Sequence, residues 1–233
     1  MPGKIFRVEL HQHTCYSPDS SITYQQLSEA YREGKFDVIA ITDHDTIEGA
    51  VKFREKGDFP IIIGEEITTP GNKDLIGLFL TERIPPFLSL KETIAAIKSQ
   101  GGLVMAAHPF NRVNLGIGKK GLLDYLDDID IVEVYNAAGG DLMERNSRAL
   151  EFARNYGKLM SAGSDAHFVN EIGSAVSLIE AKDLEELLTP MGLLRGLKGC
   201  EFDVNYYSVF NCMVRRLFYI FKMMLYRRTL PSV

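Results

Sequence analysis

Cysteine is scarce in this sequence. There are three cysteines in 233 residues, Cys15, Cys200 and Cys212, and their odd number and wide spacing argue against a disulfide framework. We therefore expect reduced thiols in a cytoplasmic protein. Cys15 lies near two histidines and is a candidate soft metal ligand. No second cysteine accompanies it, so a packing role is the favoured interpretation.

Long uncharged hydrophobic runs are also missing. No such run reaches about 18 residues, so we expect no transmembrane helix, and the opening MPGKIFRVEL contains no apolar signal segment. The net charge of −5 gives no general attraction to nucleic acids or anionic membranes. The sequence also lacks a P-loop, a G-x-G-x-x-G motif after a strand, internal repeats and low-complexity linkers.

Two kinds of segment alternate along the chain. Short apolar, β-branched runs predict strands at 6–10, 37–43, 60–67, 75–80, 102–108, 130–136, 159–163 and 174–179. Segments that start at Ser, Thr or Asp, or stop at Gly, predict helices at 22–34, 46–57, 89–101, 121–129 and 141–157, with a loop at 108–121. The alternation predicts an α/β fold with parallel strands and crossover helices. Seven or eight such units favour a barrel over an open sheet.

All five histidines close or directly follow a predicted strand. They are His11, His13, His44, His108 and His167. The carboxyl ends of parallel barrel strands meet on one face, where active sites are built. Carboxylates occupy the same strand ends, at Asp19, Asp43, Glu66, Asp74, Glu133 and Asp165.

The spacing within two of these groups predicts a metal centre. Residues i and i+2 of a strand point to the same side, so His11 and His13 aim two imidazoles at one point. Asp165 and His167 repeat this arrangement. A single histidine at a strand end is more simply explained as a hydrogen-bonded loop residue, whereas the ordered set of five indicates metal binding. Imidazoles with carboxylates suit Mn, Zn or Fe without a clear preference.

The motifs around these residues resemble those of the PHP (polymerase and histidinol phosphatase) family, in particular its small stand-alone metal-dependent phosphoesterase branch. The matching motifs are HQHTCYSPDS, ITDHDTIEGA, GEEITT, AAHPF, EVYN and GSDAH, in the family's order over residues 8–167. The resemblance implies a distorted TIM-like (β/α)7 barrel, here assigned to residues 1–200, with its metal site at the C-terminal ends of the strands. It also implies two or three divalent metal ions per chain.

The resemblance assigns ligands to three ions. The first would be held by His11, His13, Glu66 and Asp165. The second would share Glu66 and add His108, and the third would be held by Asp19, His44 and His167. Many relatives have a histidine where this chain has Asp74, which is either a ligand of the second ion or a solvated strand residue.

Catalytic and supporting roles follow from the same resemblance. Glu66, Asp165 and His167 are the expected catalytic residues. Asp43 either binds a metal or orients a histidine.

The expected function is hydrolysis of a phosphate ester by metal-activated hydroxide. The substrate would be a nucleotide, a short oligonucleotide or a small metabolite, contacted by Asn111, Arg112 and Asn136. Lys119 and Lys120 are interpreted as surface charges. The alternatives are a histidinol-phosphate or sugar-phosphate monoesterase and, in another class, a catalytically silent metal-binding interaction domain.

Residues 201–233 differ in character from the rest, with five basic and two acidic residues among apolar and aromatic ones. Arg215, Arg216 and Lys222 interrupt the apolar run, so we expect a basic amphipathic helical segment that does not span a bilayer. It would pack on the barrel or a second subunit, lie on a membrane surface or contact a nucleic-acid backbone.

Overall fold

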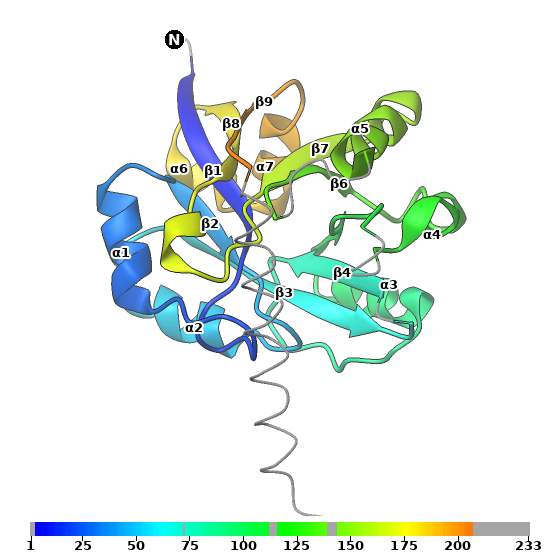
Figure 1. Cartoon of the computed structure of the whole chain (residues 1–233), viewed down its shortest axis with the longest axis horizontal. Coiled ribbons are helices and arrows are strands. Elements are labelled where there is room, and N and C mark those ends of the chain that lie inside the picture. The colour runs from blue at the N-terminus through cyan, green and yellow to red at the C-terminus, as the bar shows by residue number, and fades with distance from the viewer. Residues whose placement is uncertain (1–2, 72, 112–115, 139–143, 207–233) are drawn as a thin grey trace, which may run out of the picture.

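The computed structural model describes residues 3–71, 73–111, 116–138 and 144–206. Within these residues, one sheet curls almost into a barrel and helices cover its outside (Figure 1). The strands are β1 (Lys4–Gln12), β2 (Val38–Ile41), β3 (Ile61–Thr69), β4 (Lys73–Leu78), β5 (Leu103–Ala106), β6 (Ile131–Asn136), β7 (Leu159–Gly163), β8 (Ala175–Ala181) and β9 (Glu201–Val204). The predicted α/β class and distorted TIM-like barrel are confirmed.

The predicted direction of the strands is wrong in part. The order is β7-β6-β5-β4-β3-β2-β1-β8-β9, and β4 is antiparallel to both of its neighbours, as is β8. The reversal of β4 has a local cause, because only three residues separate Thr69 of β3 from Lys73 of β4, and so short a connection makes a hairpin. As a result β4 begins where β3 ends, and Asp74 lies opposite Thr68.

Backbone contacts between the end of β1 and the residues after β7 join two parts of the sheet that are not neighbours in the strand order. Gln12 and Ala166 form an isolated parallel bridge. The Asp165 N–H donates to the His11 carbonyl at 2.9 Å, and the His13 N–H donates to the Ala166 carbonyl at 3.3 Å. Segments more than 150 residues apart in sequence therefore meet at the strand ends.

All five predicted helical segments form helices. They are α1 (Tyr24–Arg32), α2 (Glu48–Arg54), α3 (Leu90–Ser99), α4 (Gly118–Asp124) and α5 (Arg145–Asn155). Capping boxes begin two of them, at Thr23 before α1 and at Ser89 before α3. Helix α4 starts earlier than predicted, inside the expected loop. The short helices α6 (Leu184–Leu187) and α7 (Pro190–Gly196) and the 3-10 turn η2 (Val169–Glu171) were not predicted.

Alternate residues of the strands feed two hydrophobic clusters on opposite faces of the sheet. Ile39 and Ile41 of β2 pack with helix residues such as Phe53, whereas Val38 and Ala40 pack in a second cluster. Leu193 of α7 belongs to this second cluster. The apolar interior therefore holds the strands rigidly, and the polar site is confined to their ends.

The expected helical segment at 201–233 begins instead with a strand. Strand β9 pairs with β8, and Asp203 forms an ion pair with Arg7 of β1 at 2.9 Å, so the sheet continues past residue 200. Residues 207–233 lie outside the described part of the chain, and the amphipathic helix stays a prediction. Across the described residues, no helix is both long and apolar enough to cross a membrane.

Candidate metal centre

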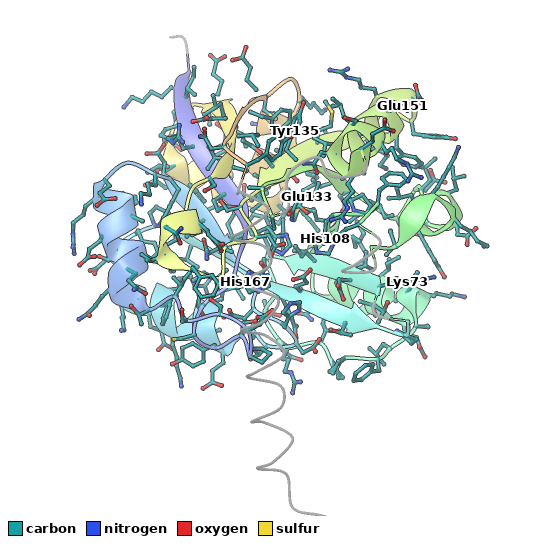
Figure 2. The ribbon with its side chains drawn as sticks, viewed as in Figure 1. Lys73, His108, Glu133, Tyr135, Glu151 and His167 are labelled. Carbon is teal, nitrogen blue, oxygen red and sulfur yellow. The ribbon has the colours of Figure 1, made fainter. Side chains whose placement is uncertain are left out.

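The five histidines gather at the strand ends. His11 lies within β1 and His13 just after it, while the other three follow β2, β5 and β7. His108 and His167 lie near Glu133 at the centre of the molecule, although they come from different strand ends (Figure 2). Four of the five are buried, and the His44 side chain is 24% exposed. The predicted convergence is therefore present in the fold.

Glu66 of β3 lies at the middle of the group. One carboxylate oxygen, Oε1, is 3.0 Å from His108 Nε2. The other, Oε2, is 3.2 Å from His11 Nε2 and 3.1 Å from His13 Nε2. A carboxylate whose two oxygens face different imidazoles has the geometry of a bridge between adjacent cation positions. The neighbouring Glu65 points the other way and accepts a hydrogen bond from the Ile84 N–H at 2.8 Å.

The donor atoms fall into three groups that could each hold a metal ion among the described residues. One contains His11, His13 and Asp165, and a second contains His11, Glu66 and His108. The third contains His13, Asp19, His44 and His167. The third group thus adds His13 to the ligands expected from the sequence. No group includes Cys15, which is exposed.

Hydrogen bonds behind two imidazoles fix their tautomers. Nδ1 of His11 donates to Glu133 Oε1 at 3.0 Å, and Nδ1 of His167 donates to the Asp165 carbonyl at 2.8 Å. Each Nε2 is then left with a lone pair directed into the group, as a metal-binding histidine requires. His11 Nε2 and His13 Nε2 face each other at 3.2 Å. Two nitrogens that both direct lone pairs at one point fit a shared cation, so the residues suit the divalent ions that the resemblance implies.

The charges of the buried carboxylates and imidazoles also favour the binding of cations. Burial would raise the pKa of Glu66 and of Asp19, but the surrounding histidines hold both carboxyl pKa values well below their ordinary range. Burial would lower the pKa of His108, but Glu66 raises it to about 9. The buried carboxylates therefore stay ionised and attract positive charge, which divalent ions would supply.

The sequence matches two known family models. The model of the PHP domain matches residues 9–103, and the model described as PHP-associated matches residues 143–197. The chain belongs to the PHP family. Its similarity to the uncharacterized protein MJ0417 of Methanocaldococcus jannaschii is 36% identity over 199 residues, which cover 82% of this chain and 79% of that protein.

Solved structures share the PHP fold at low sequence identity. A two-domain protein from Bacteroides vulgatus that contains a predicted PHP-like metal-dependent phosphoesterase superimposes with a TM-score of 0.70 at 17% identity, covering 94% of this chain and 70% of that one. The lesion-specific endonuclease PfuEndoQ from Pyrococcus furiosus gives a TM-score of 0.62 at 18% identity. That match covers 84% of this chain and 56% of the endonuclease, so this chain spans about half of that protein.

Asp74, a possible ligand of the second ion in the sequence analysis, is buried close to the group. Burial and the neighbouring Glu66 carboxylate raise the pKa of Asp74 to about 7. Asp74 reaches this end of the barrel because β4 is reversed. It belongs to none of the three donor groups found among the described residues.

Asp43 supports the loop that follows His13. Its Oδ1 accepts from the Thr14 N–H at 2.6 Å, and its Oδ2 accepts from the Thr14 hydroxyl at 2.7 Å. Burial raises the pKa of Asp43 to about 6. Both oxygens are thus engaged with Thr14, and the predicted roles of Asp43, as a metal ligand or as a residue that orients a histidine, stay predictions.

The three residues predicted to contact substrate lie in different surroundings or outside the described residues. Asn111 is buried, and its N–H donates to the His108 carbonyl at 2.8 Å. Asn136 donates to Glu133 at 3.1 Å and to Asp165 Oδ2 at 3.4 Å, so it orients carboxylates of the PHP site. Arg112 lies outside the described residues.

Two buried acids that hold the histidines, Glu133 and Glu171, were not predicted as site residues. Glu133 bonds to His11 through one oxygen and accepts the His108 N–H at 2.6 Å through the other. Glu171 accepts the His167 N–H at 2.8 Å. An acid within the apolar run IVEVYN was the available signal for Glu133, because a strand interior rarely contains an unpaired charge.

Two of the donors, His108 and Asp165, are among the non-glycine residues with a positive φ. His108 and Asp165 have φ angles of 27° and 50°, in the left-handed region that side chains other than glycine rarely adopt. Such strain persists only where the surroundings hold it, here through the backbone hydrogen bonds of both residues. The sequence contains no signal for it.

Glu65 points away from the histidine and carboxylate donors. Its replacement should therefore change how the stability of the protein depends on pH. Burial raises the pKa of Glu65 to about 7 from 4.5, so the unfolded state gains by ionisation as the pH rises from 4.5 to 7 and the free energy of unfolding falls. Glu65→Gln removes this loss, which we expect to be on the order of 1–3 kcal/mol. Denaturant unfolding of the metal-free protein at pH 5 and pH 8 measures it. The exposed Glu55→Gln is the control. If the free energy of unfolding changes equally between pH 5 and pH 8 in wild type and in Glu65→Gln, the prediction is wrong.

Gly163 leaves the space in which Glu133 meets His11. A Cβ at this position would overlap Glu133 Oε1 and lie 2.5 Å from the His11 Cβ. Gly163→Ala should therefore displace the pair and destabilise the protein by about 1–3 kcal/mol. Thermal unfolding and elemental analysis of bound metal measure the two effects. Wild-type stability together with wild-type metal content would show that the pair does not need this space.

Proposed function

We propose that this chain is a metal-dependent phosphoesterase that acts on a nucleotide, a short oligonucleotide or a small phosphorylated metabolite. The observation that carries the proposal is the bridging position of Glu66, with oxygens 3.0 Å from His108 and 3.1 Å from His13. A shared carboxylate between imidazole groups is suited to a multinuclear centre, and such centres hydrolyse phosphate esters.

The proposed ions are Mn, Zn or Fe, two or three per chain. The first would be held by His11, His13, Glu66 and Asp165. The second would be held by Glu66 and His108, and the third by Asp19, His44 and His167. When bound, the ions would lower the pKa of a water molecule toward neutrality and neutralise phosphoryl oxygens.

The protein residues would orient the donors and handle the proton. Glu133 holds the His11 ring, and the Asp165 carbonyl holds the His167 ring. Asn136 steadies the Asp165 carboxylate, whose Oδ1 is 3.3 Å from His13 Nε2. A carboxylate held in this way can accept the proton released when water attacks a phosphate. Glu66, Asp165 and His167 are the proposed catalytic residues.

The relatives support the same reaction class. One fold neighbour is described as containing a predicted PHP-like metal-dependent phosphoesterase and another as a lesion-specific endonuclease. An endonuclease cleaves a phosphodiester, so an oligonucleotide is included among the proposed substrates.

Two adjacent glutamates on β3 provide a matched test. Glu66→Gln should lower phosphate release by at least about 100-fold and reduce the bound metal, because an amide cannot bridge two cations. Glu65→Gln, one residue away on the opposite side of the strand, should retain both. Elemental analysis and phosphate release with added Mn²⁺ are the measurements. Equal activity of the two variants would refute the proposed bridge.

Asp74 and His108 should differ in importance. His108 Nε2 lies 3.0 Å from the bridging carboxylate, whereas Asp74 is outside the donor groups. We expect about a tenfold loss of kcat/KM for Asp74→Ala and about a hundredfold loss for His108→Ala. Steady-state kinetics at saturating metal measures both, and a larger loss for Asp74→Ala would reverse the assignment.

A further inference from the structure

Phe87, in the loop between β4 and α3, combines an exposed side chain with a strained backbone. The residue is 66% exposed, and its φ angle is 65°. A positive φ is uncommon for residues other than glycine and is an outlier for a bulky one. A single exposed aromatic residue is ordinary on a protein surface, but one held in an unfavourable conformation is not. Such strain persists only where the surroundings impose it, and it clusters at active and ligand-binding sites.

The backbone on either side of Phe87 is fixed. The Phe87 N–H donates to the Thr68 carbonyl of β3 at 2.7 Å. Two prolines, Pro85 and Pro86, precede it, and each fixes its own φ. Leu88 follows it and packs against the larger hydrophobic cluster. The loop therefore turns Leu88 inward and presents Phe87 to solvent at a defined position.

The same loop is tied to the residue that follows His44. Nε of Arg83 donates to the Asp45 carbonyl at 2.6 Å. The Asp45 carboxylate accepts the Thr68 N–H at 2.8 Å, and the Asp45 N–H donates to the Glu66 carbonyl at 3.0 Å. Asp45 therefore connects the loop both to a histidine of the donor groups and to the bridging glutamate.

The donor groups are partly open to solvent on this side. The His44 side chain is 24% exposed, whereas that of His11 is fully buried. Solvent, and therefore a substrate, reaches the donors beside His44. Thr68, which accepts the Phe87 N–H, lies two residues beyond Glu66, or about 7 Å along the strand. In a nucleotide the sugar spans a separation of this order between the phosphate and the base.

We propose that the ring of Phe87 stacks on a nucleobase of the substrate while the phosphate that is hydrolysed occupies the donor groups. Aromatic side chains stack on bases with little regard to base identity, because every base has a π-face. This role rests on the proposed phosphoesterase function and narrows its substrates to nucleotides and short strands, in preference to sugar phosphates. The strained backbone fits the role, because it keeps the ring in solvent, where a base can reach it.

Hydrolysis of adenosine 5′-monophosphate and of ribose 5-phosphate, which lacks the base, provides the first test. We expect wild type to favour the nucleotide by at least about tenfold in kcat/KM. Phe87→Gly should reduce this preference by about tenfold, whereas Phe87→Tyr, which keeps a stacking ring, should restore it. Glycine suits a φ of 65°, so Phe87→Gly should unfold at no lower denaturant concentration than wild type. Met191→Ala removes an equally exposed apolar side chain from α7 and should preserve the preference.

The sequence contains no tryptophan, which allows base stacking to be measured directly. Phe87→Trp introduces a single indole, whose fluorescence a stacked base should quench. The zinc-loaded variant is titrated with the phosphonate analogue of adenosine 5′-monophosphate, in which a methylene group replaces the ester oxygen and prevents hydrolysis. We expect saturable quenching by this analogue and none by inorganic phosphate. Tyr156→Trp, just after α5, is the control and should respond to neither.

The two measurements separate base stacking from the proposed activity. If no compound is hydrolysed but the analogue quenches Phe87→Trp and not Tyr156→Trp, the phosphoesterase proposal fails and the stacking site stands. If the nucleotide is hydrolysed without such quenching, or if Phe87→Gly keeps the wild-type preference, the stacking site is refuted. Hydrolysis of the 5′-phosphorylated trinucleotide of adenosine distinguishes the sources of the base. A higher kcat/KM for the trinucleotide identifies a strand, and a higher kcat/KM for the monophosphate identifies a free nucleotide.

Discussion

The contact that joins the end of β1 to the residues after β7 determines the rest of the site. The Asp165 N–H donates to the His11 carbonyl, and Ala166 pairs with Gln12. These backbone bonds bring the H-x-H and D-x-H pairs together, although His11 and Asp165 are 154 positions apart in the sequence. The backbone bonds that close the barrel therefore also bring the metal-binding side chains together. Little further ordering of these side chains is needed to form the site.

A second constraint is electrostatic. The site buries carboxylates and imidazoles that would each lose hydration without compensation. Their arrangement supplies some compensation, because Glu66 and Asp19 keep their low carboxyl pKa values through neighbouring histidines. A cluster that keeps its buried carboxylates ionised beside imidazole nitrogens is preorganised for cations. The apolar clusters on both faces of the sheet contribute the rigidity that such preorganisation needs.

Much of the fold and of the candidate metal centre could be predicted from the local periodicity of the sequence. The strands, the positions of the five histidines and the outward turn of Glu65 relative to Glu66 follow from a period of two and from strand ends that meet on one face. The reversal of β4 depends on a three-residue connection, and β9 on pairing with β8, so helical composition at 201–204 was misleading. The bond from Glu133 to His11, the space at Gly163 and the unpaired Arg145 depend on contacts between distant segments, which local patterns do not contain.

Strand β6 links the metal centre to the start of α5. Glu133, within the strand, orients His11 and fixes the backbone of His108. Asn136, at its end, steadies Asp165 with its side chain and anchors Asn146 of α5 with its backbone. The position of Arg145 is therefore tied to the same strand that orients the donors, so a displacement of β6 would move both together. This shared support fixes the position of α5 relative to the donor groups, as a preorganised site requires.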